Sequence, residues 1–287
     1  MAIGVFDSGV GGLSVHRALV ERFPTADLIY LSDQANMPYG GKPGEEIVAL
    51  TRAGCERLFA EGCDLVILGC NTASAIALRR LQQTWIPGCR QKLGRSVNVL
   101  GIIVPTIESA TGLPWSHEAE PRALNDGEKA EQLEVLGVFS TPATAASRVY
   151  EIEIDKRQPD LAVFSEPCPH LARLIEAGAD HAELKTHVEG HVAALKTRIG
   201  RHPDRAVLGC THYEIIADLF RAALPAGTPL IHQPGATADA VERYLPRHPE
   251  YDAGSSGLRR FLTTGAPGPQ NGLVGTFWGE PLAFEPA

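Results

Sequence analysis

The sequence predicts an α/β protein made of two pseudo-symmetric halves, each built on a parallel sheet of the Rossmann-like or flavodoxin-like kind. Short apolar runs alternate with helical patterns along most of the 287 residues, which is typical of βαβ units. The halves also share a signature. The run IGVFDSG at 3–9 has an echo in LGVFSTP at 136–142, and LGCNT at 68–72 has an echo in LGCTH at 208–212. Two such halves can face each other across a cleft and present one thiol from each side.

The first half shows the alternation most clearly. Its short apolar runs predict strands at 2–6, 27–32, 64–69 and 98–103, and the segments between them predict helices at 12–22, 45–61 and 73–83. In the helix at 45–61, Ile47, Leu50 and Leu58 recur at helical spacing and mark the face that should be buried.

The second half repeats the pattern after an interruption. Residues 114–134 are polar and acidic without an apolar face, so we interpret them as a solvated surface excursion. Strands then follow at 134–139, 161–164 and 205–209, and helices at 144–150, 171–177, 188–199 and 213–223. The tail after Pro249 is rich in Gly and Pro, and its apolar stretch at 258–262 should pack back on the first domain. We therefore expect one α/β domain from 1–102 plus 230–287 and a second from 103–229.

Composition and charge exclude several classes of protein. The chain is 44% apolar and 21% charged, as in soluble globular proteins, and its apolar runs are too short to span a bilayer. It enters a strand pattern at Ile3 without a basic and then apolar leader, so we expect a cytoplasmic location. The net charge is −8 and the 26 Lys and Arg form no basic stripe, so neither nucleic acid nor a membrane is an expected partner.

Two of the six cysteines occupy matching positions. Cys70 and Cys210 each follow an apolar strand and precede a polar pair and a helix. Ligand sites in open parallel sheets lie at the carboxyl ends of strands, and a helix N-terminus favours the thiolate. A reaction that moves a proton on and off both faces of a carbon needs such a pair of acid/bases. The other four cysteines lack this context and are interpreted as reduced structural thiols: Cys55, Cys63, Cys89 and Cys168.

The loop DSGVGG at 7–12 ends the first strand and opens a helix. It fails the dinucleotide fingerprint because Ser14 stands where a glycine is required, and it lacks the GKS/T of a nucleotide-triphosphate loop. Its glycines still let backbone N–H groups approach a carboxylate. Asp7 could cap the helix, act on a proton or hold an ammonium group. His212, two residues after Cys210, could support ionisation of that thiol.

Three other kinds of site are weighed against this interpretation. His187 and His191 lie four apart on a predicted helix, but a third ligand is not near them in sequence, so we expect a solvated face and no metal. The six lysines fit no pyridoxal cofactor motif, although a Schiff-base lysine is the usual alternative for racemisation. A non-catalytic protein that closes two lobes around a carboxylate also remains open. The second thiol in the matching loop is the feature against it.

Four motifs in order make the chain resemble the glutamate racemase family, the cofactor-independent branch of the aspartate/glutamate racemase superfamily. They are FDSGVGGL at 6–13, MPYG at 37–40, GCNTASA at 69–75 and LGCTHY at 208–213. The likeness runs nearly end to end and includes STPAT at 140–144, Cys168-Pro169, LIE at 174–176 and the segment 230–238. It implies two pseudo-symmetric α/β domains with the site in the cleft between them, and a homodimer.

The resemblance also implies roles for individual residues. Cys70 and Cys210 match the two thiols that act on opposite faces of the α-carbon, Asp7 and His212 match auxiliary acid/base residues, and Glu176 matches a supporting carboxylate. The positions that match substrate-binding residues are Asp7, Ser8, Tyr39, Gly40, Asn71, Thr72, Thr141, Thr144, Thr211 and His212.

The expected reaction is the interconversion of L- and D-glutamate without pyridoxal phosphate or metal. By the resemblance, its product feeds peptidoglycan synthesis, and therefore cell-wall biogenesis and cell shape. An aspartate or other amino-acid racemase or isomerase of the same superfamily is the alternative. The chain departs from the usual pattern at Asn36, in place of a basic residue, at Glu214, in place of a proline, and in the length of the excursion at 114–134. The first two lie beside binding loops, where they could alter substrate choice.

Overall fold

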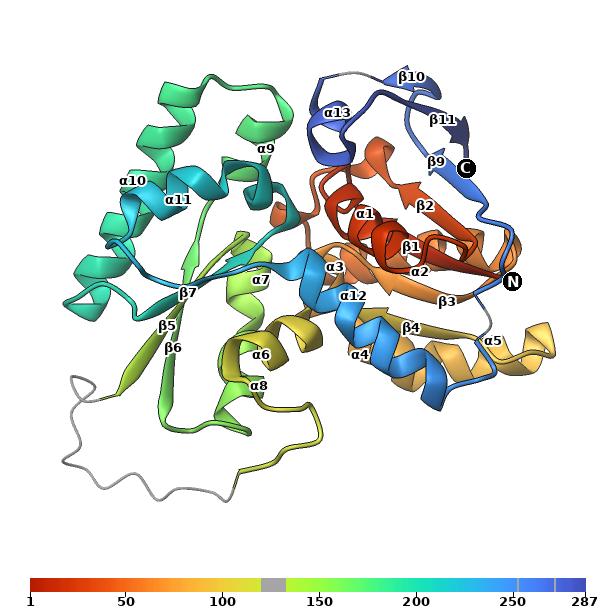
Figure 1. The fold of residues 1–287 in the computed structure, drawn as a ribbon, viewed down its shortest axis with the longest axis horizontal. Coiled ribbons are helices and arrows are strands. Elements are labelled where there is room, and N and C mark those ends of the chain that lie inside the picture. The colour runs from red at the N-terminus through yellow and green to blue at the C-terminus, as the bar shows by residue number, and fades with distance from the viewer. Residues whose placement is uncertain (120–132, 252, 271) are drawn as a thin grey trace.

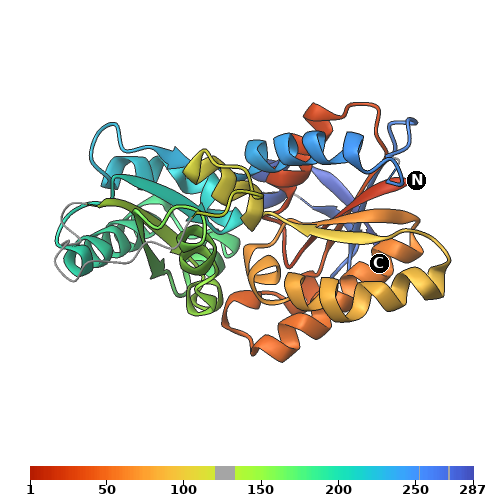
Figure 2. The ribbon, with the colours of Figure 1, turned by 90° about the horizontal axis from the view of Figure 1, so that it is seen from below.

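The computed structural model describes residues 1–119, 133–251, 253–270 and 272–287. The chain forms two α/β halves that lie side by side, with both termini in the half that holds the larger sheet (Figure 1). The view turned by 90° shows helices on both faces of that sheet (Figure 2). The predicted α/β class with two parallel sheets is confirmed.

The larger sheet has seven strands in the order β10-β11-β9-β2-β1-β3-β4. Its central strands are apolar and buried along their whole length, as expected for a parallel sheet covered on both faces. The only antiparallel pairing among its described strands joins β10 to β11. The bounds are β1 Ala2–Asp7, β2 Leu28–Ser32, β3 Cys63–Leu68, β4 Asn98–Gly101, β9 Arg259–Thr263, β10 Gly268–Gln270 and β11 Leu282–Pro286.

The smaller sheet repeats the topology of the first four strands. Its order is β6-β5-β7-β8, which corresponds to β2-β1-β3-β4 of the larger sheet. The strands are β5 Glu134–Ser140, β6 Leu161–Pro167, β7 Arg205–Gly209 and β8 Leu230–Ile231. Strands β1 and β5 are therefore equivalent, as are β3 and β7. The repeated sequence signature thus corresponds to a repeated strand order.

Helices bury two core clusters against the larger sheet. One face is covered by α2 (Gly44–Ala60) and by the run from α3 (Asn71–Ile76) and α4 (Leu78–Arg80) to α5 (Ile86–Leu93). The other face is covered by α1 (Leu13–Arg22), α12 (Gln233–Tyr244) and α13 (Leu273–Trp278). In α2, Ile47 and Leu58 are buried as the apolar spacing predicts, whereas Leu50 is only partly buried at the edge of this face.

The smaller sheet is also covered on both faces. Helices α9 (Leu171–Glu176), α10 (His181–Ile199) and α11 (Ala217–Ala223) pack on one side, and α6 (Ile103–Thr111) and α8 (Val149–Asp155) pack on the other. The short α7 (Pro142–Ser147) contacts α3 of the other half. In the part of the chain that the structure describes, no helix is long and apolar enough to cross a membrane.

Several predicted boundaries are wrong for physical reasons. The strand at 98–103 stops at Gly101, and α6 begins at Ile103, where the β-branched run Ile-Ile-Val had suggested a longer strand. The helix at 73–83 continues as α4, a π-helical turn at Leu81–Trp85 and α5. The helix at 144–150 is two helices, because Arg148 adopts a left-handed conformation with φ of 53°.

Two polar stretches also differ from expectation. Helix α10 begins at His181, seven residues before the predicted start at 188, because Asp180 caps it by accepting a hydrogen bond from Glu183 N (2.8 Å). The excursion at 114–134 is not solvated throughout. The Trp115 ring packs against the core of the smaller sheet and stacks under the Arg157 guanidinium, 3.4 Å from its centroid. Residues 120–132 of that excursion lie outside the described residues.

The tail returns to the larger sheet as expected. Strand β9 pairs with β2 from Leu28 opposite Arg259 to Ser32 opposite Thr263, so the apolar stretch at 258–262 does join the first half. Strand β8, however, pairs with β7, so Leu230–Ile231 belong to the smaller sheet, just beyond the predicted boundary at 229. The division into domains 1–102 plus 230–287 and 103–229 otherwise stays a prediction.

Candidate active site

The candidate site is formed where equivalent strands of the two sheets end. Asp7 is the last residue of β1, and Cys70 follows β3 and caps α3. In the other half, Thr141 follows β5 and caps α7, and Cys210 follows β7. Because the carboxyl ends of parallel strands meet at one edge of a sheet, each half presents its polar side chains at one edge.

Cys70 is a buried thiol with two hydrogen-bond partners. Its Sγ lies 3.4 Å from Ser8 Oγ and accepts from Ala73 N at 3.5 Å. Burial and then the Asp7 charge raise the pKa of the Cys70 thiol to about 12, although Ser8 and Ala73 act in the opposite direction. In the absence of substrate, Cys70 is therefore a thiol near neutral pH.

Cys210 has a different neighbour, an imidazole. Its Sγ lies 3.8 Å from His212 Nδ1, and His212 Nε2 lies 2.8 Å from Glu176 Oε1 at the end of α9. The second contact is electrostatic, since its geometry does not meet the requirements of an aligned hydrogen bond. Burial alone would lower the pKa of His212, but Cys210 and Glu176 together raise it well above its ordinary value. The arrangement therefore holds a proton on the imidazole beside the Cys210 sulfur.

Asp7 is completely buried at the end of β1. Its Oδ2 accepts hydrogen bonds from Gly9 N (3.2 Å) and Gly12 N (3.0 Å), whereas Oδ1 has no hydrogen-bond partner among the described residues. Burial raises the pKa of the Asp7 carboxyl, and the charge of His212 opposes that effect. The carboxyl group is thus fixed in place and keeps one free oxygen.

The glycine loop of the first half rests directly on the second half. A Cβ at Gly11 would lie 2.6 Å from Thr211 Oγ1, and one at Gly9 would lie 2.7 Å from Glu176 Oε1. Only glycine allows this approach of the loop to its neighbour. The loop that follows Asp7 therefore meets the loop that carries Cys210 and His212. A negative charge on Cys210 would also raise the pKa of the Cys70 thiol.

Three threonines connect the halves beside Cys70. Thr72 Oγ1 lies 2.9 Å from Thr141 Oγ1 and 3.4 Å from Thr144 Oγ1, and Thr141 donates to Thr144 at 3.1 Å. Gly40 lies against the same group, since a Cβ there would be 2.8 Å from Thr141 Cβ. These predicted substrate-binding residues are therefore gathered in one place.

The loop that carries Tyr39 is held by a buried carboxylate. Tyr39 OH donates to Asp33 Oδ2 at 2.5 Å, and Asn36 Nδ2 donates to Asp33 Oδ1 at 2.9 Å. Thr264, after β9, donates to the same carboxylate at 2.6 Å. Asn36, the first departure from the family pattern, thus supports this loop from within the protein.

Glu214, the second departure, caps helix α12. Its Oε1 accepts from Gln233 N at 3.1 Å, and its Oε2 lies 2.7 Å from His232 Nδ1. The carboxylate raises the pKa of His232. Glu214 therefore joins the loop after Cys210 to the helix that crosses to the larger sheet.

Asn71 has partners that the sequence analysis did not identify. Its side chain is hydrogen-bonded to Gln233 and Tyr150, and Gln233 also reaches Thr106. All four side chains are buried. One signal in the sequence could have pointed to Gln233 as a site residue: it lies just after the carboxyl end of β8, and ligand sites in parallel sheets lie at the carboxyl ends of strands.

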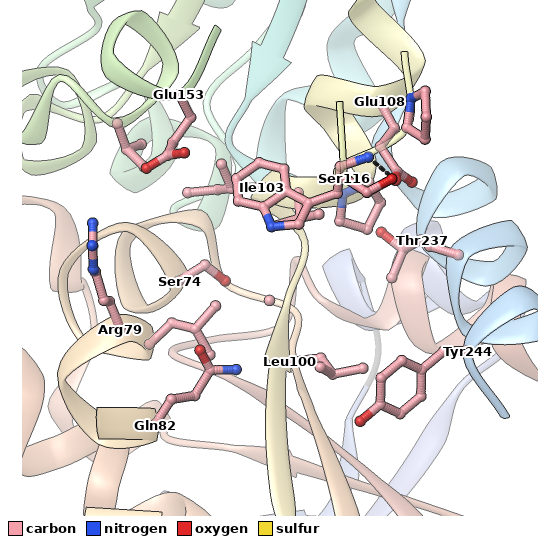
Figure 3. Close-up of a pocket in the computed structure, with 18 of the residues that line it drawn as sticks. Ser74, Arg79, Gln82, Leu100, Ile103, Glu108, Ser116, Glu153, Thr237 and Tyr244 are labelled. Carbon is pink, nitrogen blue, oxygen red and sulfur yellow. Dashed lines mark hydrogen bonds between the residues drawn. The ribbon is translucent and has the colours of Figure 1, made fainter. Parts of the chain in front are cut away.

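A large cavity of about 1160 Å³ lies between the halves. Helices α3, α6, α8 and α12 border it, and Ser74, Ile103 and Thr237 are seen on its wall (Figure 3). None of the cysteines or the predicted acid/base residues lines it. In the described ranges, His, Cys, Asp and Glu side chains form no group of three or more that could hold a metal ion.

Comparisons with known proteins give one consistent result. The chain is 77% identical over 287 residues, the full length of both chains, to a glutamate racemase of Caulobacter sp. (strain K31). Its structure is similar to glutamate racemase isoform RacE1 from Bacillus anthracis, with a TM-score of 0.79, 25% identity and coverage of 100% of this chain and 97% of the other. It is also similar to a Francisella tularensis glutamate racemase in complex with D-glutamate (TM-score 0.75, 25% identity, coverage 99% and 95%). No protein-family model matches the chain. The family resemblance seen in the sequence is confirmed.

Proposed function

Because this chain belongs to the glutamate racemase family of isomerases, we propose that it interconverts L- and D-glutamate by passing the α-proton between Cys70 and Cys210. The supporting observation is that the two thiols follow equivalent strands of two like sheets, in halves whose loops meet at Gly11 and Thr211. In each direction, one thiolate takes the α-proton from one face, and the other thiol delivers its proton to the opposite face. The product complex then holds the reverse protonation state, ready for the reverse reaction.

His212 and Glu176 support the second thiol in this proposal. The imidazole lies beside the Cys210 sulfur, and Cys210 together with the Glu176 carboxylate holds it protonated. It can give a proton to Cys210 after that thiol has reprotonated the substrate, or take one back. The pair therefore acts as a local proton store for one face of the substrate.

Asp7 and the hydroxyl groups have complementary tasks. The free Oδ1 of Asp7 can accept a hydrogen bond from the α-ammonium of glutamate. Hydroxyl groups of Ser8, Thr72 and Thr211 can donate to its carboxylates and stabilise the carbanion, which is the difficult intermediate for an acid as weak as an α-C–H group. Little water reaches thiols that are this deeply buried, so these fixed donors are more effective than they would be in solvent.

The proposal requires neither pyridoxal phosphate nor metal, because the two thiols supply both the base and the acid. The thiols must stay reduced, which is the state that the cytoplasm maintains. We further propose that D-glutamate from this reaction supplies peptidoglycan synthesis, and hence the cell wall and cell shape. A homodimer belongs to the same proposal and depends on the family resemblance alone.

The test is α-proton exchange in D₂O. Purified protein, freed of cofactors, is incubated with L-glutamate while optical rotation and α-deuteration are followed by NMR. We expect rotation to be lost as deuterium enters the α-position. Cys70→Ser and Cys210→Ser should each slow racemisation by roughly a hundredfold or more, the scale of an acid/base contribution. Cys89→Ser, a partly buried cysteine outside the site, is the matched control and should keep the activity.

Each alternative has its own result in this experiment. Exchange with L-aspartate but not with L-glutamate would assign a different substrate within the superfamily. Binding of glutamate without exchange would identify a two-lobed binding protein. An absorbance of bound pyridoxal in the untreated protein would indicate a Schiff-base lysine. Full activity in either cysteine variant would contradict the two-thiol mechanism.

A further inference from the structure

A buried pair of side-chain amides next to Cys70 links α3 to α12 and is bonded to Thr106 and Tyr150 of the second half. Asn71 Nδ2 donates to Gln233 Oε1 at 2.7 Å, and Gln233 Nε2 donates back to Asn71 Oδ1 at 2.9 Å. Asn71 begins α3 and adjoins Cys70 in the chain, whereas Gln233 begins α12, one residue after the strand β8 of the smaller sheet. Asn71 is 2% exposed and Gln233 is 0% exposed, so water does not compete for these bonds.

The neighbours of this pair determine how both amides are oriented. Thr106 uses its hydroxyl hydrogen to donate to the Ile102 carbonyl at 2.6 Å, so it can only accept from Gln233. The atom of Gln233 that lies 2.9 Å from Thr106 Oγ1 must therefore be the amide nitrogen. The oxygen of Gln233 then faces Asn71, which must turn its own nitrogen toward that oxygen. Tyr150 completes the arrangement by donating to Asn71 Oδ1 at 3.1 Å.

This orientation leaves Asn71 with donor capacity. Its Oδ1 already accepts from two groups, Tyr150 and Gln233. Its Nδ2 carries two hydrogens but donates to a single acceptor, Gln233 Oε1, within the described part of the chain. One N–H of Asn71 is thus uncommitted, in the first turn of a helix that Cys70 caps and beside Thr72 of the threonine group. A carboxylate is the natural acceptor for such a donor.

We propose that Gln233 is a positioning residue for substrate binding, which holds Asn71 so that its free N–H donates to a carboxylate of glutamate. This inference rests on the proposed function, since it takes glutamate as the ligand. Gln233 does not itself touch the substrate. It acts through Asn71, and if the Asn71 amide were reversed, an oxygen would face the negatively charged ligand instead of a donor.

A double-mutant cycle separates this role from a general contribution to stability. The dissociation constant of D-glutamate is measured by calorimetry for the wild type, Asn71→Ala, Gln233→Leu and the double variant. Loss of a hydrogen bond to a charged group weakens binding by about tenfold or more. We expect this loss in each single variant, and less than a twofold further loss when Gln233→Leu is added to Asn71→Ala. In steady-state assays, Gln233→Leu should raise KM by the same factor and change kcat much less.

A second variant and a control keep the test decisive if Gln233→Leu does not fold. Thr106→Val removes the acceptor that orients Gln233 but leaves Gln233 in place, and we expect it to weaken glutamate binding several-fold. Asn98→Leu is the matched control. It removes another polar contact to α12, the hydrogen bond to Tyr244 OH (3.1 Å), but does not involve Asn71. It should leave the dissociation constant unchanged.

The outcomes distinguish this inference from the proposed function. Equal losses on adding Gln233→Leu to the wild type and to Asn71→Ala would overturn the positioning role, as would unchanged binding in Gln233→Leu. If the wild type binds glutamate and shows the expected cycle but does not racemise it, the inference stands and the proposed reaction fails. If the wild type does not bind glutamate, both fail.

Discussion

His16 provides a quantitative test of the packing beneath the glycine loop. It lies in α1, completely buried, with Tyr30, Phe261 and Trp278 around it at ring-centroid distances of 5.4–5.5 Å. Neither ring nitrogen has a hydrogen-bond partner among the residues that the structure describes. Burial, with a smaller contribution from the Arg259 charge, lowers the pKa of His16 to about 3.

The sign of the pH effect follows from this lowered pKa. Below pH 6.5 the unfolded chain binds a proton at His16, but the folded protein does not bind one until pH falls to about 3. Stability is therefore complete above pH 6.5 and decreases as the solution becomes more acidic. The slope is about 1.4 kcal/mol per pH unit within that range, so a change from pH 7.5 to pH 5 should cost about 2 kcal/mol from this one group.

The assay is urea unfolding of the wild type and of His16→Leu at pH 7.5 and pH 5. Leu fills a similar volume among the aromatic rings and cannot be protonated. Other titrating groups contribute equally to both proteins and cancel in the comparison. We expect the free energy of unfolding of the variant to fall by about 2 kcal/mol less than that of the wild type between the two pH values. Equal losses in both proteins would refute the argument that His16 is buried in its neutral form.

Three further predictions concern the site and the packing of the second half. Gly11→Ala places a Cβ 2.6 Å from Thr211 Oγ1, so we expect the loops to separate and kcat/KM to fall at least tenfold in the racemase assay. Arg157→Ala removes a buried guanidinium that stacks on Trp115 and donates to its carbonyl, and should lower the free energy of unfolding by about 2–3 kcal/mol in urea melts. Unchanged stability would show that this contact contributes nothing. In ligand-free protein, Cys70 with a pKa of about 12 should react slowly with iodoacetamide at pH 7.5, and the rate measured by mass spectrometry should rise about tenfold per pH unit. Rapid labelling at pH 7.5 would contradict that pKa.

Local pattern in the sequence was enough to predict the central strands of both sheets, but not β8, β10 or β11. Strands β1, β3, β5 and β7 are short apolar runs, buried on both faces, and their positions were predicted to within one or two residues. The repeated signature also located Cys70 and Cys210 at equivalent strand ends. These features are local, because a buried strand and the polar residue after it are encoded within one run of the chain. The roles of the two cysteines in catalysis stay a prediction.

Local pattern failed to predict secondary structure where tertiary contacts determined whether a segment became helix or strand. The run at 102–104 is β-branched, but it enters helix α6 because Ile103 and Ile107 pack on the smaller sheet. Helix α10 starts in a polar stretch that has little apolar periodicity, since its Asp180 cap compensates for that weakness. In such segments the propensity of the sequence is weak, and tertiary contacts determine the result.

The amide pair was beyond the reach of the sequence altogether. Asn71 and Gln233 lie 162 residues apart, and either could hydrogen-bond to many other groups. Only the packing of α3, α6, α8 and α12 brings them together with Thr106 and Tyr150. Thr106 orients them because its hydroxyl hydrogen is committed to Ile102, so that it can only accept from Gln233. The sequence by itself thus determined the two sheets and the strand ends that carry the thiols. The tertiary structure decided which distant side chains become the hydrogen-bond partners of site residues such as Asn71. A buried polar group must take its partner from whatever the fold places beside it.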